Sequence, residues 1–176
     1  RFKIKGGILT VVRCLFTKNK AKKGGGLNSE HNLRVNLEDC IFSSNVATFG
    51  GGFYIEQVDN ANISRILVFN NSADYLGGLF LDGNQENSEP FSHVNNLNAT
   101  FNTAKEWTGG VRFDHGGGYF KNSVISSNSA RVCGGFFDQC WKPSKRYIQF
   151  SLFYNNSAKE RVGAFCAFHI MHQSQF

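Results

Sequence analysis

Long hydrophobic runs are missing from this 176-residue chain. No apolar stretch approaches the ~18 residues that a transmembrane helix needs, so the sequence predicts no membrane-spanning helix. Residues 1–5 are basic, but only a short apolar stretch follows them, and no targeting segment is visible. The first residue is arginine rather than methionine, so we expect processing or a longer parent chain.

Proline is scarce, with two residues against 19 glycines, while the hydrophobic content is 41%. This composition suits stacked strands joined by tight turns better than helices, and it argues against disorder. A concentrated basic stripe is also missing, because the lysines and arginines behind the net charge of +6 are spread along the chain. Since no nucleic-acid-binding module is recognisable either, we predict no nucleic-acid partner.

What the chain does contain is a tandem repeat. An Asn-x-Ala step occurs six times, at Asn19, Asn45, Asn71, Asn102, Asn128 and Asn156. Subtracting neighbouring numbers gives spacings of 26, 26, 31, 26 and 28 residues. A glycine pair follows each Ala by four or five residues, with Gly163-Ala164 in its place in the last copy. Short apolar runs before the Asn and after the glycines are typical of strands.

A unit of this size cannot bury its apolar face alone, so the copies must stack, with about 4.8 Å between hydrogen-bonded neighbours. The sequence therefore predicts an all-β fold, a right-handed parallel β-helix of about six coils of ~26 residues that forms one domain over residues 1–176. We expect the six asparagines to form a ladder, because Asn tolerates a left-handed backbone and its amide can pair with the Asn of the next coil.

The repeats resemble a known family. Phe-x-x-Asn steps at 16–19, 42–45 and 153–156, together with Gly-Gly-apolar steps at 77–79 and 134–136, are similar to the repeats of chlamydial polymorphic membrane proteins and of large surface proteins of some protists. The resemblance implies a surface or secreted β-helix that acts in adhesion. The chain departs from the pattern at Val68, Ala99 and Ile125, where Phe is usual.

A carboxylate stands four residues after the second glycine of each of the first four glycine pairs, at Glu30, Glu56, Asp82 and Asp114. Stacked carboxylates repel one another and need compensation. The column therefore predicts a calcium-binding edge, since calcium takes several carboxylate oxygens. The alternative is a row of solvated acids that splay apart. No other cofactor is predicted.

Two outward columns of apolar side chains are also predicted. Tyr54, Phe80 and Phe137 alternate with residues expected to point inward, so we expect them to face outward and to hold sugars or a partner chain. Another segment of the same protein could cover them instead. The strands before the Asn carry two adjacent apolar columns, one with Phe16, Phe42, Val68, Ala99, Ile125 and Phe153 and a second with Leu15, Ile41, Leu67, Val124 and Leu152. Because adjacent strand residues face opposite ways, one of the two columns should be exposed unless something packs on it, which favours lateral assembly.

The cysteines and sequons suggest a secreted chain. Cys14 and Cys40 share a repeat position, so stacking should bring them within disulfide reach, or they form a plain thiol ladder instead. Cys133 and Cys140 flank one corner and could close it. The odd count of five leaves at least one thiol free or intermolecular. N-glycosylation sequons begin at Asn62, Asn70, Asn98 and Asn155.

Two polar segments, residues 82–90 and 141–146, break the period and predict loops on a rigid scaffold, where binding is often found. Enzyme chemistry has less support, because the chain lacks an Asp-Asp step and offers only Asp114-His115 as a faint echo of β-helical pectinases. We therefore expect a non-catalytic, extracellular or cell-surface module with a structural or adhesive role. It would assemble with itself, with neighbouring subunits or with glycans. A carbohydrate-binding module and a polysaccharide lyase or hydrolase are the alternatives.

Overall fold

The structure, a computed structural model, describes residues 6–84, 91–140 and 145–169. Within these ranges the chain forms 22 strands and no helix, so the all-β prediction is confirmed. All the strand pairs are parallel, and they build three sheets that we call A, B and C. One coil passes through A, then B, then C, and the next coil stacks on it.

Sheet A is the largest and carries two strand segments per coil. Its strands are β1 (Gly7–Val12), β2 (Leu15–Thr17), β5 (Asn32–Glu38), β6 (Ile41–Ser43), β9 (Asn60–Phe69), β12 (Phe91–Thr100), β15 (Gly117–Lys121), β16 (Val124–Ser126), β19 (Arg146–Gln149) and β20 (Leu152–Tyr154). In coils three and four the two segments merge into the single strands β9 and β12.

Sheets B and C have one strand from each of six coils. Sheet B contains β3 (Lys20–Lys23), β7 (Val46–Phe49), β10 (Ser72–Ala73), β13 (Thr103–Ala104), β17 (Ser129–Ala130) and β21 (Ser157–Ala158). Sheet C contains β4 (Leu27–Glu30), β8 (Phe53–Val58), β11 (Leu79–Gly83), β14 (Val111–Asp114), β18 (Phe136–Cys140) and β22 (Phe165–His169). The six predicted coils are therefore present.

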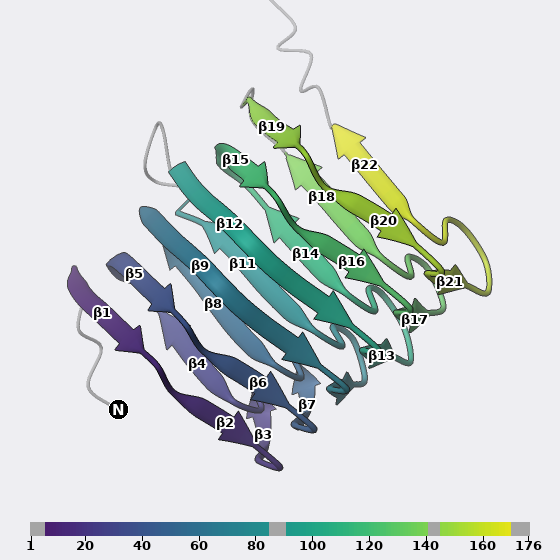
Figure 1. The fold of residues 1–176 in the computed structure, drawn as a ribbon, viewed down its shortest axis with the longest axis horizontal. Coiled ribbons are helices and arrows are strands. Elements are labelled where there is room, and N and C mark those ends of the chain that lie inside the picture. The colour runs from purple at the N-terminus through teal and green to yellow at the C-terminus, as the bar shows by residue number, and fades with distance from the viewer. Residues whose placement is uncertain (1–5, 85–90, 141–144, 170–176) are drawn as a thin grey trace, which may run out of the picture.

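The path of the chain is right-handed. In Figure 1 the strands of sheet A run across the front toward the lower right, the chain turns through sheet B, and the strands of sheet C return behind. Successive coils move from left to right, so the chain turns clockwise as it advances along the axis. Right-handed crossovers are the rule for parallel strands.

The core lies between the three sheets. Alternate residues of each strand point into it, and Phe42, Phe53, Phe113, Phe120 and Phe136 are among its largest fully buried side chains. Equivalent rings of neighbouring coils stack, as Phe16 and Phe42 do with centroids 4.8 Å apart. Burial of each such side chain stabilises the fold by about 1.5–3 kcal/mol, so the stacking supplies what one coil could not.

The turn before sheet B differs from the prediction in one respect. At this turn the left-handed residue is the one before the ladder Asn, with φ between 52° and 56° at Lys18, Ser44, Asn70, Phe101, Ser127 and Asn155. The expected left-handed conformation of the ladder Asn itself was wrong. The preceding residue reverses the chain, and the ladder Asn can then aim its amide into the interior.

The glycine pairs mark the corner between sheets B and C. A Cβ on Gly51 would lie 2.2 Å from the carbonyl oxygen of Gly77 in the next coil. No side chain fits at that distance. The recurrence of glycine is therefore a consequence of close contact between coils.

Candidate functional site

The six repeated asparagines form a continuous hydrogen-bonded ladder inside the corner between sheets A and B. Each side-chain amide donates to the Oδ1 of the Asn in the next coil, as Asn45 does to Asn71 at 3.1 Å. The backbone N–H of each Asn donates to the same oxygen, at 2.9–3.0 Å. The ladder thus links all the coils from Asn19 to Asn156.

A further bond completes each step. The Nδ2 of Asn71 also donates to the carbonyl oxygen of Phe42 in the preceding coil, at 2.9 Å. The ladder asparagines from Asn45 to Asn128 are buried. Because both of their side-chain atoms are engaged within the solenoid, these residues have a structural role and present nothing to a ligand.

The predicted column of carboxylates is divided into two pairs. Glu30 lies opposite Glu56, and Asp82 lies opposite Asp114, but a bulge between β8 and β11 interrupts the register. Gln57, with φ of 56°, lies at this bulge. The four acids therefore do not form one evenly spaced row.

Each of the four carboxylates contacts a cationic or titratable side chain of the same chain. Lys23 bridges Glu30 at 3.2 Å and Glu56 at 2.8 Å. Arg112 contacts Asp114 through two bonds of 2.8 Å. In the described residues no group of three or more His, Cys, Asp or Glu side chains is placed to hold a metal ion.

Asp82 contacts His115, with Oδ1 2.6 Å from Nδ1. Burial raises the pKa of Asp82 to about 6, although the contact with His115 opposes the shift. The charges of Asp114 and Glu56 add to the increase. An aspartate next to a histidine could relay a proton, but here both side chains are mostly buried in the wall of the solenoid.

The predicted aromatic column does not face solvent. Tyr54 and Phe80 are 7% exposed and Phe137 is 3% exposed, so of the two alternatives the cover by another segment of the chain is confirmed and exposure to solvent is not. Tyr54 and Phe80 stack with centroids 4.7 Å apart and pack against Leu76, with Phe49 and Tyr75 beside them. The chain between sheets B and C folds over the outer face of sheet C and covers these rings.

Phe137 is covered at the same corner. It packs with Cys133 and Cys166, and the guanidinium of Arg112 lies 4.8 Å from its ring. The covering residues were overlooked at the sequence level. Their signal is the apolar residue that directly precedes the glycine pair, as in Leu76 and Cys133.

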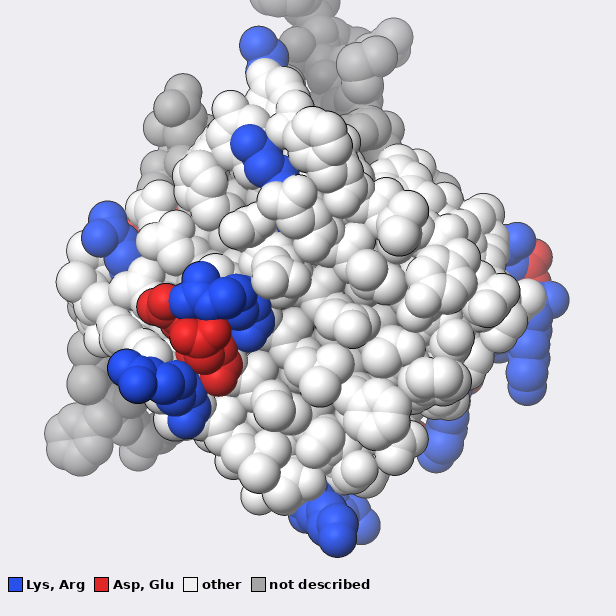
Figure 2. All heavy atoms as spheres, viewed as in Figure 1, with Lys and Arg blue, Asp and Glu red and all other residues white. Residues whose placement is uncertain are grey.

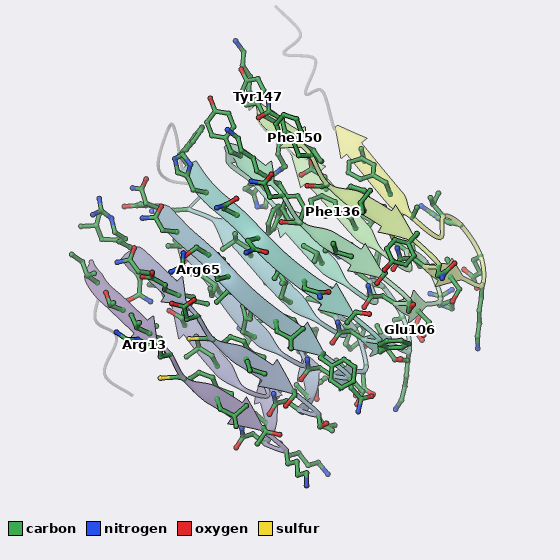
Figure 3. All side chains as sticks on the ribbon, viewed as in Figure 1. Arg13, Arg65, Glu106, Phe136, Tyr147 and Phe150 are labelled. Atoms are coloured by element: carbon green, nitrogen blue, oxygen red, sulfur yellow. A yellow bond between two sulfur atoms is a disulfide. The ribbon has the colours of Figure 1, made fainter. Side chains whose placement is uncertain are left out.

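The outer face of sheet A is open, in contrast. Leu15, Ile41 and Leu152 from the second predicted column are exposed. Most of the large exposed apolar side chains of the described residues lie on this sheet or in its bends: Ile8, Val12, Leu15, Leu33, Ile41, Phe69, Tyr147, Phe150, Leu152 and Tyr154. Tyr147 and Phe150 are labelled in Figure 3. Figure 2 shows that much of this face bears no Lys, Arg, Asp or Glu.

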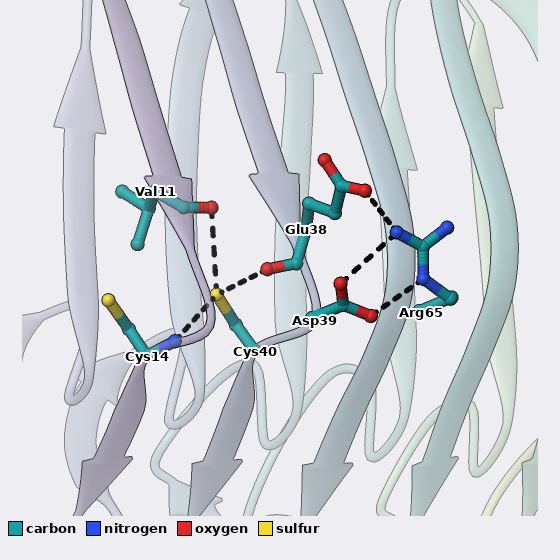
Figure 4. Close-up of polar contacts among 6 residues, drawn as sticks. All are labelled: Val11, Cys14, Glu38, Asp39, Cys40 and Arg65. Carbon is teal, nitrogen blue, oxygen red and sulfur yellow. Dashed lines mark hydrogen bonds and ion pairs between the residues drawn. The ribbon is translucent and has the colours of Figure 1, made fainter.

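Arg65, Glu38 and Asp39 form a charged cluster on this face, while Arg34 and Lys121 lie elsewhere on it. Arg65 contacts Glu38 and donates to Asp39 at 2.6 Å (Figure 4). The guanidinium of Arg65 lowers the pKa of Asp39. The cluster neutralises much of its own charge, and apart from Arg34 and Lys121 most of the face is apolar or aromatic or carries amides and hydroxyls.

An aromatic column on sheet A was missed at the sequence level. His93, Tyr119 and Tyr147 occupy one register position in successive coils. The centroids of His93 and Tyr119 are 5.5 Å apart, and those of Tyr119 and Tyr147 are 5.1 Å apart. The signal was the 28-residue spacing of the two tyrosines, which equals the local repeat.

One disulfide is present in the described part of the chain, and it joins Cys133 to Cys166, with Cα atoms 6.4 Å apart. The predicted closure of a corner by Cys133 and Cys140 was wrong, because Cys133 is bonded instead to Cys166 of the coil that stacks on its own. Cys14 and Cys40 are free thiols. The backbone N–H of Cys14 donates to Sγ of Cys40 (Figure 4).

The four sequon asparagines are all exposed. Asn70 and Asn155 lie at the left-handed turn positions, whereas Asn62 and Asn98 lie on the outer face of sheet A. The two predicted loops fall partly outside the described residues, at 85–90 and 141–144. Both interrupt the corner between sheets C and A.

The fold defines the chain as a parallel β-solenoid with an interior asparagine ladder. No protein-family model, curated protein or solved structure matches it. A search of the described residues for a helix long and apolar enough to span a membrane found none.

Proposed function

We propose that this chain is a non-catalytic structural or adhesive β-helix module of an extracellular or cell-surface protein. The observation that carries the proposal is the outer face of sheet A, which in the described residues presents an open surface with few charges, where exposed apolar and aromatic side chains lie among amides and hydroxyls on a rigid scaffold. Exposed apolar patches of this extent mark interaction surfaces in soluble proteins. The repeat resemblance to chlamydial polymorphic membrane proteins supports the same role.

The charged side chains favour this proposal over catalysis. The carboxylates of sheet C are held by Lys23, Arg112 and His115 within the chain. Glycoside hydrolysis needs a pair of carboxylates with access to substrate, one of them a proton donor. Carboxylates that are already paired with Lys23, Arg112 or His115 of the same chain do not supply such a pair.

A disulfide in the described residues supports an oxidising compartment, since cytosolic proteins rarely keep structural disulfides. Asn70 and Asn155, the exposed sequon asparagines at the left-handed turns, support a secreted glycoprotein. Native mass spectrometry of the protein secreted from a eukaryotic host would measure attached glycans. We expect added glycan mass that is lost after enzymatic deglycosylation.

The role itself is tested with beads coated with the chain. We expect the beads to adhere to cell surfaces more than albumin-coated beads do, and we expect no turnover of a panel of acidic polysaccharides. Turnover of any polysaccharide would identify the chain as an enzyme. Retention on a glycan array without adhesion to protein-coated surfaces would identify a carbohydrate-binding module.

A further inference from the structure

We propose that the outer face of sheet A binds the same face of a second copy of this chain, so that two solenoids pack sheet against sheet. The proposal rests on the structural role proposed above and names its partner. It starts from the asymmetry between the outer faces: the chain covers sheet C with its own turns, whereas none of the described residues forms such a cover over sheet A.

The area of the face suits a stable pair. Strand β9 spans ten residues. At ~3.3 Å per residue and ~4.8 Å between coils, six coils give a face of roughly 33 Å by 24 Å, or about 800 Å². A specific dimer of standard size buries about 800 Å² on each partner. The face is therefore large enough without help from other surfaces.

The repeat of the face favours a copy of itself. Outward side chains stand in rows separated by one coil, as Leu15 and Ile41 do in β2 and β6. Two sheets pack with the side chains of one between those of the other, about 10 Å apart. Only a partner with the same coil spacing keeps those rows in phase across six coils.

The aromatic column argues against a sugar as the occupant. A sugar stacks on the open face of a ring, but Tyr119 lies between His93 and Tyr147 in the column. Lys121 Nζ also lies 4.2 Å from the centroid of the Tyr119 ring. The column therefore offers mainly ring edges, and edges pack well against apolar side chains of another sheet.

The charged cluster around Arg65 is compatible with a pair. Arg65 is already paired with Glu38 and Asp39, so burial of this cluster would not leave a lone charge without a partner. A new lysine at an apolar position of the face would be unpaired. Two copies related by a two-fold axis would each place that lysine in the interface.

Two matched variants test the surface. Ile41 on β6 is 40% exposed on sheet A, and Val46 on β7 is 42% exposed on sheet B of the same coil. In sedimentation velocity over micromolar concentrations, we expect the wild type to dimerise, Ile41→Lys to weaken the dimer about tenfold or more, and Val46→Lys to match the wild type. Circular dichroism and Tm check that each variant is folded.

A monomeric wild type overturns the proposal, and so does equal behaviour of the two variants, which would place the contact elsewhere. If Ile41→Lys does not fold, Leu152→Lys at a 62% exposed position takes its place. The two proposals fail separately. Beads that adhere while the chain stays monomeric leave the adhesive role standing, whereas a dimer on beads that do not adhere leaves only the pairing.

Discussion

The outer faces of sheets C and A have similar apolar patterns and opposite environments. Phe80 in sheet C is buried under the turn that contains Leu76, whereas Leu152 in sheet A is exposed. Both residues alternate with core residues in strand and therefore point away from the core. The comparison teaches that strand alternation gives the direction of a side chain and not what covers it, because the cover comes from another part of the coil.

The largest loss of stability should come from truncating a buried side chain on the covered face of sheet C. We expect Phe80→Ala to lower the free energy of unfolding by about 3–5 kcal/mol, because a buried ring leaves a cavity. The matched change on the open face, Leu152→Ala, should stay within about 0.5 kcal/mol. Urea denaturation of both variants measures the difference. If both variants lost equally little stability, the conclusion that a turn covers Phe80 on sheet C would be contradicted.

Removal of a ladder Asn should lower the stability by less than removal of a buried ring, but still measurably. We expect Asn71→Ala to lower the free energy of unfolding by about 1–3 kcal/mol, because the change removes bonds to both neighbouring coils and leaves buried groups unpaired. Asn98, exposed on sheet A, is the control, and Asn98→Ala should be near neutral. A neutral Asn71→Ala would rule out a stabilising ladder.

The pKa values of Asp82 on sheet C and of Asp39 on sheet A should be shifted in opposite directions by folding. Burial raises the pKa of Asp82 to about 6, above about 3.9 in an unfolded chain. Its contribution is therefore complete below pH ~4 and is lost as the pH rises through about 6. We expect the stability of Asp82→Asn, relative to wild type, to rise across this window.

Asp39 provides the opposite case on the open face. Arg65 lowers its pKa, so its contribution is present above the unfolded pKa and is lost only as the pH falls through the lower folded value. Asp39→Asn should therefore show no such trend between the unfolded pKa and neutral pH. Carboxyl NMR titration measures both groups. An Asp82 that titrates at the ordinary pKa would contradict the assignment.

The addition of calcium should change the stability least of all. Because Lys23 already bridges Glu30 and Glu56, we expect millimolar calcium to leave the Tm of the wild type unchanged. Lys23→Ala removes the bridge and should make the Tm more sensitive to calcium. Thermal unfolding with and without the metal measures both. A calcium-dependent increase in wild-type Tm would instead support the predicted metal edge.

Much of the fold was predictable from the sequence because the repeat is local and regular. The six asparagines give the coil register, and the glycine pairs give the corner where coils meet closely. The left-handed position was misplaced by one residue, since Asn70 and Asn71 are adjacent and both suit a turn. Only the backbone shows that Asn70 makes the turn and Asn71 the ladder.

The candidate site was less predictable. The disulfide between Cys133 and Cys166 forms because two coils stack. Sequence spacing alone gives no reason to prefer this pair over cysteines that are closer in the chain. The bulge at Gln57 moves Glu56 out of register with Asp82, although the residue count after each glycine pair is equal. Contacts between coils decided both outcomes.

The sequence by itself determined the solenoid, its coil number and its interior ladder, because each repeat must bury its apolar residues against the next copy. Tertiary structure decided which outward residues meet solvent. The turns between sheets B and C reach over sheet C, and in the described residues no equivalent segment reaches over Ile41 and Leu152 on sheet A. Cover of this kind depends on the path of a turn in space, which the alternation of a strand does not encode.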